Sequence, residues 1–204
     1  IWSRNGFKVI SVDWDERYNA DFIQDYGTLT LEQLKDFEIV FAWFSPECRL
    51  MTLAGSMPFD PKTREPTTEE ARLHVERCKN VIALLSDLDP LYGWVMENPL
   101  ALMRKMPWVQ HLHRVTVTYC QYGRANRKPT DLFGNIPMLF FPKACRNGDT
   151  CHIATPSGTK IGPNSYNVKE RELQAYIPQE LTLALYEAAM ASNGNTIPRL
   201  SDWA

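Results

Sequence analysis

Two short apolar runs on either side of a long helical pattern constrain the fold of this chain most strongly. Residues 39–44 and 92–99 have the length and composition of buried strands. Residues 66–88 between them carry polar N-cap candidates, acidic residues in the first turn and an apolar stripe at helical spacing. A helix that connects two strands of one sheet leaves them parallel, so this order predicts an α/β fold.

The rest of the chain extends the same alternation. Residues 7–13 and 114–123 have strand-like patterns, whereas residues 30–37 and 177–192 have helical ones, the last with Pro178 near its start. We therefore predict a doubly wound, mainly parallel sheet of Rossmann-like type.

The sequence suits one domain with a small insert. Residues 1–123 form the predicted α/β core, 124–171 a basic, loop-rich segment with one or two short strands, 172–192 a helix that returns to the core, and 193–204 a tail. Residues 104–171 hold eleven Lys or Arg against three acidic residues, a net charge of +8, which leaves −10 on the rest of the chain. This asymmetry suits a phosphate-facing surface, and a solvated loop region accounts for it equally well.

Two features bear on the compartment. No run approaches the roughly 18 apolar residues of a membrane span, and the polar, mixed-charge start does not suggest a signal peptide. Five cysteines form no dense framework, which favours a reducing compartment with thiols available for metal or catalysis. We expect a cytoplasmic protein with no membrane partner.

Four chemically capable side chains fall at the ends of predicted strands: Asp13, Cys48, Glu97 and Gln121. Each has an ordinary explanation, such as a helix-capping acid, a buried thiol or a solvated carboxylate. Sites in open α/β sheets form at the carboxyl ends of strands, so four such residues together predict a shared cleft.

Several motifs carry a resemblance to a known family. "SPEC" at 45–48, "ENP" at 97–99, and "TYCQYG" with "RKPTDLF" between 118 and 133 resemble the compact, phage-type branch of DNA cytosine-5 methyltransferases. The stretches at 9–29, "ACRNGDTCH" and "YIPQEL" are also similar to compact members. The family's Phe-x-Gly-x-Gly turn, which follows its first strand and cradles the methionine part of S-adenosyl-L-methionine, is absent from this sequence.

The resemblance implies methyl transfer from S-adenosyl-L-methionine to C5 of a cytosine flipped out of double-stranded DNA, in a bacterial or phage-infected host. A thiolate that adds to C6 makes C5 nucleophilic, which is the role implied for Cys48. A buried carboxyl can protonate or hydrogen-bond N3, which is the role implied for Glu97. Gln121 and Arg127 match the segment that contacts the flipped cytosine and lines the cysteine loop. A buried packing thiol and a solvated glutamate are the alternatives for the first two residues.

On the cofactor side the resemblance implies Asp13, Trp14, Asp25 and Pro46. An acid after the first strand can bind ribose hydroxyls, and an indole can stack on adenine. Core packing is an equally good explanation for Trp14.

Basic residues are expected to face DNA. Arg49 can hold a phosphate, lower the pKa of Cys48, or pair with an anionic group on a modified cofactor. The other candidates are Arg124, Lys128, Lys143, Arg146 and Lys160.

Cys145, Cys151 and His152 flank an Asn-Gly turn and can form part of a zinc site, with Cys120 as a possible fourth ligand. Free thiols in a loop are the alternative.

Three other functions stay open. The chain can be a catalytically silent DNA-binding protein of the same fold, a C5 alkyltransferase that uses a modified S-adenosyl-L-methionine, or an enzyme acting on RNA. Only 35 residues, 134–168, occupy the interval where larger relatives carry a target-recognition domain. We therefore expect a short recognition sequence.

Overall fold

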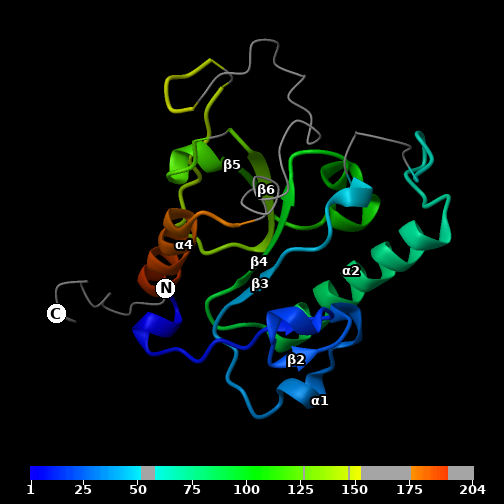
Figure 1. Cartoon of the computed structure of the whole chain (residues 1–204), viewed down its shortest axis with the longest axis horizontal. Helices are drawn as coiled ribbons and strands as arrows, with labels where there is room; N and C mark the ends of the chain where they lie inside the picture. The colour runs from blue at the N-terminus through cyan, green and yellow to red at the C-terminus, as the bar shows by residue number, and fades with distance from the viewer. Residues whose placement is uncertain (52–57, 126, 147, 153–175, 193–204) are drawn as a thin grey trace.

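The computed structural model describes residues 1–51, 58–125, 127–146, 148–152 and 176–192 (Figure 1). The predictions that fall on residues 153–175, including Lys160, and on the 193–204 tail lie outside this part of the chain. The strands are β1 Val12–Asp13, β2 Phe22–Ile23, β3 Ala42–Phe44, β4 Trp94–Pro99, β5 Arg114–Thr118 and β6 Pro129–Asn135, and the helices are α1 Leu31–Leu34, α2 Glu69–Leu88 and α4 Gln179–Ser192. Short 3-10 turns occupy Ser3–Asn5, Glu16–Tyr18, Tyr26–Thr28, Arg49–Met51, Met103–Lys105, Pro107–Val109 and Tyr119–Tyr122.

The central sheet has four strands in the order β3-β4-β6-β5. β3 and β4 are parallel, as expected for strands joined by the long helix α2. β6 is antiparallel to both β4 and β5, and the ten residues 119–128 that connect β5 to β6 are fewer than a parallel crossover needs. The predicted α/β class is confirmed, and the sheet is mixed in its strand directions.

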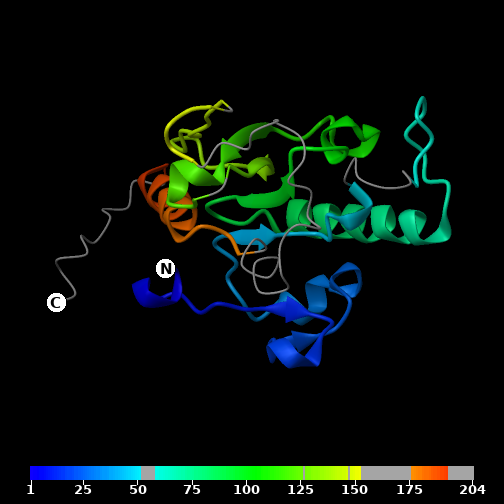
Figure 2. The same ribbon diagram turned by 45° about the horizontal axis from the view of Figure 1, so that its top comes forward.

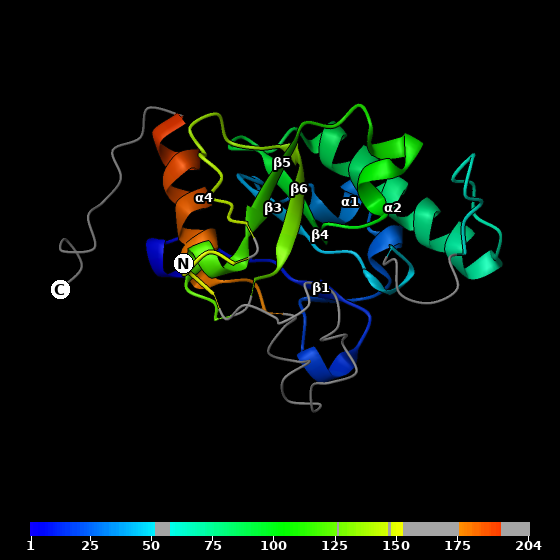
Figure 3. The ribbon, with the colours of Figure 1, turned by 90° about the horizontal axis from the view of Figure 1, so that it is seen from above.

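Helices cover both faces of this sheet. Phe44, Met96 and Phe133 pack on one face with the apolar stripe of α2, whereas Val95 and Leu132 pack on the other face with α4. This division follows from the alternation of side chains along a strand. Figure 3 shows α4 and α2 on opposite sides of the strands. Two buried polar residues, Glu97 and Asn98, lie toward the carboxyl end of β4.

β6 lies in the segment predicted to be loop-rich, and it is longer and more central than the sequence suggested. Its middle residues are buried, yet its sequence, Pro-Thr-Asp-Leu-Phe-Gly-Asn, does not alternate between apolar and polar types. Buried Asp131 is tolerated because Arg104 pairs with it at 2.5 Å and the Thr116 hydroxyl donates to it at 2.8 Å. Gly134, at φ +125°, packs so closely on Trp94 that a Cβ would lie 2.6 Å from the indole.

Helix starts follow the predicted signals. The Thr68 side chain accepts from the Ala71 N–H at the start of α2, and Thr30 forms a reciprocal capping box with Gln33 at α1. Within the described residues, no helix has both the length and the apolar character needed to cross a membrane.

The strand predicted over residues 7–13 is shorter than expected. Only Val12 and Asp13 form β1, which pairs with β2 in a separate two-stranded sheet. Figure 2 shows this blue N-terminal segment gathered outside the four-stranded sheet. It is anchored to the core by Tyr26, whose ring lies 5.2 Å from that of Phe44, and by the Asp25–Arg77 ion pair.

Candidate active site

The parallel register of β3 and β4 brings the predicted nucleophile and the predicted acid to one edge of the sheet. Phe44 lies opposite Met96, so both chains leave the sheet at the same end. The Asn98 side chain then donates to the carbonyl of buried Pro46 at 3.4 Å, which ties the chain before Cys48 to the end of β4. Cys48 and Glu97, two of the four residues predicted to share a cleft, therefore lie at one edge of the four-stranded sheet, whereas Asp13 lies on the separate two-stranded sheet.

Cys48 is half-buried beyond the end of β3. Burial raises the pKa of its thiol above the ordinary value. The positive charge of Lys128 lowers this pKa and the negative charge of Glu97 raises it. These two residues are therefore close enough to Cys48 for their charges to act on it.

Glu97 is a buried carboxylate in contact with two other polar side chains, Tyr119 and Lys128. Only 7% of the residue is exposed. The Tyr119 hydroxyl donates to Glu97 Oε1 at 2.9 Å, and Lys128 Nζ lies 3.8 Å from the same oxygen. Burial first, and then the charge of Glu97, raise the pKa of Tyr119, so its hydroxyl keeps its proton and remains a donor at neutral pH. The ammonium of Lys128 also lies 4.8 Å from the centre of the Tyr119 ring.

The structure places Arg127 and Lys128 differently from their predicted positions. Arg127 was expected at the catalytic centre, but its guanidinium donates to the Cys145 carbonyl at 3.2 and 3.0 Å. Lys128 was expected on the DNA backbone, but it faces Glu97 and Tyr119. Sequence reasoning missed Lys128 as a site residue, because its position depends on how β6 enters the sheet between β4 and β5.

Gln121 lies in the 3-10 turn Tyr119–Tyr122, half-buried between buried Cys120 and buried Tyr122. The turn that carries Tyr119 to Glu97 therefore also carries Gln121 to the same edge of the sheet.

Arg49 forms ion pairs with two exposed carboxylates. Its guanidinium pairs with Glu47 at 2.8 Å and also with Glu70 on α2. These hydrogen bonds raise the pKa of Arg49. The positive charge that lowers the pKa of Cys48 is that of Lys128.

The cofactor-side candidates fall into two groups. Trp14 has 72% of its surface exposed, so core packing does not explain it, and its indole is accessible for stacking. Asp13 ends β1, where its Oδ1 accepts from the Asp15 N–H at 2.9 Å. Asp25 instead accepts from the Gly27 N–H and pairs with Arg77 at 2.6 Å, so its carboxylate holds the N-terminal segment against α2.

The basic candidates beyond β5 are mostly on the surface. Lys143 and Arg146 are exposed, whereas the Arg124 guanidinium donates to the Tyr176 carbonyl at 3.0 Å. Arg124 thus links the turn after β5 to the residues that lead into α4.

The predicted metal ligands lie together. One ligand atom from each of Cys120, Cys145, Cys151 and His152 lies within 4.8 Å of the others. Cys120, named as the possible fourth member, reaches this cluster from the turn after β5.

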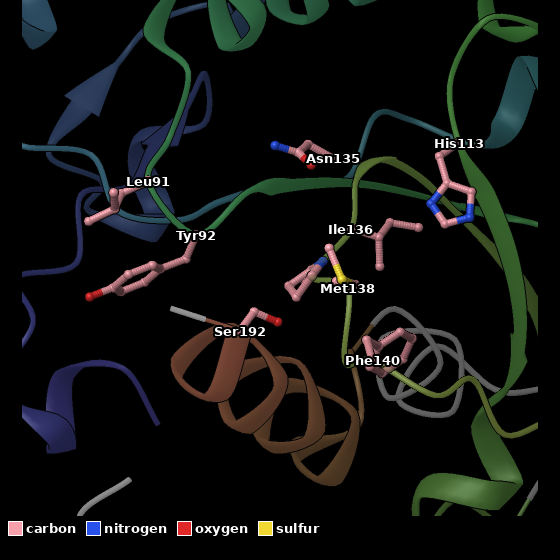
Figure 4. A pocket seen from close by; sticks show the side chains of 9 residues that line it. Leu91, Tyr92, His113, Asn135, Ile136, Met138, Phe140 and Ser192 are labelled. Carbon is pink, nitrogen blue, oxygen red and sulfur yellow. The ribbon is translucent and has the colours of Figure 1, made fainter. Parts of the chain in front are cut away.

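A separate pocket of about 420 Å³ opens at the other end of the sheet (Figure 4). Tyr92 precedes β4, His113 precedes β5, and Asn135 ends β6. Figure 4 also places Ser192, the last residue of α4, at this pocket. None of the sequence-predicted site residues within the described part of the chain lines it, so this pocket is separate from the edge that carries Cys48 and Glu97.

No protein-family model matches the chain, and no curated protein matches it. Similar solved structures include Schizosaccharomyces pombe Dnmt2 methyltransferase, with a TM-score of 0.44, 14% identity and coverage of 75% of this chain and 50% of that one. The Entamoeba histolytica methyltransferase EhMeth has a TM-score of 0.42 and 11% identity, with coverage of 67% and 48%. A Spodoptera frugiperda DNMT2 variant has a TM-score of 0.41 and 15% identity, with coverage of 75% and 52%. The chain spans about half the length of each of these structures.

Proposed function

We propose that this chain is the catalytic part of a DNA cytosine-5 methyltransferase that works through a covalent bond between Cys48 and C6 of a flipped cytosine. The observation that carries the proposal is the gathering of Cys48, Glu97, Tyr119 and Lys128 at one edge of the sheet. A nucleophile, a carboxyl, a fixed hydroxyl donor and a cation are the groups that addition to a pyrimidine ring requires.

Cys48 supplies the nucleophile. Its sulfur forms a bond to C6, and the displaced electron pair of the C5–C6 bond makes C5 nucleophilic. Because burial raises the pKa of Cys48, most of the group is a thiol at neutral pH, and the nearby cation favours the thiolate. Lys128 is therefore assigned the task of stabilising the attacking thiolate.

Glu97 supplies the contact to the pyrimidine edge. Tyr119 donates to one carboxyl oxygen, which fixes the group while the other oxygen can face N3. Electron density that reaches the ring on thiolate addition is then stabilised by a proton or hydrogen bond at N3. Transfer ends when a base removes the C5 proton and the Cys48–C6 bond breaks.

S-adenosyl-L-methionine, when bound, supplies the methyl group from a positively charged sulfonium. Asp13 and exposed Trp14 are the residues of this chain that suit its ribose and adenine. Buried Pro46 lies in the chain between β3 and Cys48, where cofactor and nucleophile would meet.

Zinc is a second proposed component. Three thiols and an imidazole suit this ion, and the transfer chemistry above uses no metal, so its role would be to stabilise the fold.

Double-stranded DNA is the proposed substrate, and its target cytosine would have to leave the stack, because C5, C6 and N3 are all reached only outside it. Exposed Lys143 and Arg146 suit the phosphates beside such a base. A silent DNA-binding protein would have no need of a nucleophile beside a buried carboxyl, so the geometry favours an enzyme.

DNA containing 5-fluorocytosine tests the proposal. Fluorine at C5 cannot leave as a proton, so the adduct between Cys48 and the methylated ring should persist as a band of increased mass that depends on S-adenosyl-L-methionine. The Cys48→Ala variant should give no such band. An adduct formed with RNA and not with DNA would redirect the assignment to an RNA enzyme, and no adduct with either would refute it.

A further inference from the structure

We infer that Cys120, Cys145, Cys151 and His152 form a closed structural zinc site that holds the segment 143–152 against the corner carrying the candidate catalytic residues. The proposal rests on the proposed function only for its effect on turnover. Metal binding and its effect on stability stand independently of that function.

Five of the six separations between the four ligand atoms are close to those around a tetrahedral ion, and the sixth is within 4.8 Å. Zinc–sulfur bonds of about 2.3 Å and zinc–nitrogen bonds of about 2.0 Å give ligand separations of roughly 3.5–3.8 Å around a tetrahedron. Cys120 Sγ lies 3.2 Å from Cys145 Sγ and 3.7 Å from Cys151 Sγ. His152 Nδ1 lies 3.8, 3.6 and 3.3 Å from the sulfurs of Cys120, Cys145 and Cys151. These separations lie within a few tenths of an ångström of that range.

The ligand set favours a structural role. Four protein ligands complete the shell of zinc, whereas a catalytic zinc keeps a position for water or substrate. Three thiolates also favour zinc over magnesium or calcium, which prefer oxygen. The cluster therefore has no open position for chemistry.

The cluster joins segments that are distant in the sequence. Cys120 lies in the 3-10 turn Tyr119–Tyr122, whereas the other three ligands follow β6. Hydrogen bonds already bring these segments together: the Cys145 N–H donates to Thr118 Oγ1 at 2.9 Å, and the Thr118 N–H donates to the Lys143 carbonyl at 3.0 Å. A bound ion would add three sulfur bonds and one nitrogen bond at this junction.

The junction adjoins the candidate active site on two sides. Cys120 directly follows Tyr119, which donates to Glu97. The carbonyl of Cys145 accepts both hydrogen bonds from Arg127, which directly precedes Lys128. Tyr119 and Lys128 both contact the Glu97 carboxylate. Loss of the ion should therefore make the positions of these two side chains less fixed.

Metal analysis of the purified protein is the first test. The wild-type chain should contain about one zinc per molecule, and a Cys120→Ser/Cys151→Ser double variant should contain almost none. Cys48→Ser is the matched control, because this cysteine lies outside the cluster, and it should keep its zinc. Cobalt(II) in place of zinc should give the strong visible absorption of a tetrahedral thiolate site.

Stability provides a readout that does not depend on enzymatic activity. Removal of the ion with a chelator should lower the midpoint of thermal unfolding, and added zinc should restore it, because an ion that binds only the folded chain stabilises it. A wild-type chain that neither contains zinc nor binds added zinc or cobalt would overturn the proposal. So would a Cys120–Cys145 disulfide in the freshly isolated protein, or an unfolding midpoint that zinc leaves unchanged.

Discussion

The hydroxyl of Tyr119, in the 3-10 turn that follows β5, donates a hydrogen bond at 2.9 Å to Oε1 of Glu97 on β4, and both residues are buried. This contact fixes the carboxyl at the edge of the sheet where Cys48 lies. Replacing Tyr119 with phenylalanine removes this hydrogen bond and keeps the aromatic ring.

Tyr119→Phe should destabilise the fold and slow methyl transfer. The buried Glu97 carboxylate would lose its hydroxyl donor, which costs about 1–3 kcal/mol of unfolding free energy. We expect turnover to fall more than substrate affinity, because the carboxyl loses its fixed orientation. Denaturant unfolding and steady-state kinetics measure the two effects. Tyr122→Phe is the control, since its hydroxyl accepts from the Lys143 N–H and does not contact Glu97. Equal kinetic losses in both variants would contradict the role given to Tyr119.

Substitutions of Cys48 and Glu97 should affect methyl transfer and the reactivity of the Cys48 thiol in different ways. Cys48→Ala should abolish methyl transfer. Glu97→Gln should slow it by about 10²–10⁴-fold, the usual contribution of a positioned acid or base. The same Glu97→Gln change should nevertheless speed the reaction of Cys48 with iodoacetamide at a fixed pH, because removing a negative charge lowers the pKa of the thiol. Mass spectrometry of the Cys48 peptide measures this reaction. Near-normal methylation by either variant would refute the assignment.

Lys128 should control the pH dependence of Cys48. Burial places the pKa of this thiol above its ordinary value, so its alkylation rate should keep rising with pH through the alkaline range. Lys128→Met removes the charge that lowers this pKa, and the rising limb should therefore move to higher pH. Lys143→Met serves as the matched control, because its ammonium lies over the Tyr122 ring and is not among the charges that act on Cys48. Identical pH profiles for wild type and Lys128→Met would contradict the inference.

The ion pair between Arg104 and the buried Asp131 of β6 should be essential for stability. Arg104→Met leaves the Asp131 carboxylate, 1% exposed, without its cation. Removing one partner of a buried pair costs about 3 kcal/mol or more of unfolding free energy. Arg72→Met is the control, since this arginine pairs with Glu69 and Glu76 on the exposed face of α2 and should have little effect. Chemical denaturation of both variants, monitored by tryptophan fluorescence, measures the difference. Equal midpoints would show that Arg104 is dispensable.

The recognised DNA sequence should be short, and DNA binding should be sensitive to salt. Few residues lie between β6 and α4 for reading base edges, and specific readers usually bury about 1,000 Å² or more of protein surface. We expect a recognition sequence of roughly two to four base pairs and steep weakening of binding with added salt. Bisulfite sequencing of treated DNA and binding at several salt concentrations provide the test. Methylation confined to one motif of about six or more base pairs would show that this region reads far more than expected.

Local sequence patterns determined the parts of the structure that depend on neighbouring residues. The α2 helix begins after Thr68, within the stretch that carries the polar N-cap candidates, and the apolar runs around it form the parallel pair β3 and β4. Because parallel strands end at the same edge of a sheet, the sequence also placed Cys48 and Glu97 together. These features follow from hydrogen bonding and periodicity within short stretches.

Tertiary structure alone decided the parts that depend on which distant segments meet. β6 enters the middle of the sheet although its sequence lacks a strand-like alternation, because Arg104 neutralises its buried aspartate. That insertion places Lys128 beside Glu97 and Arg127 beside the Cys145 carbonyl, contacts that the sequence analysis did not anticipate. It also brings the later thiols to Cys120. Such contacts depend on strand order and long-range packing, which no local pattern specifies.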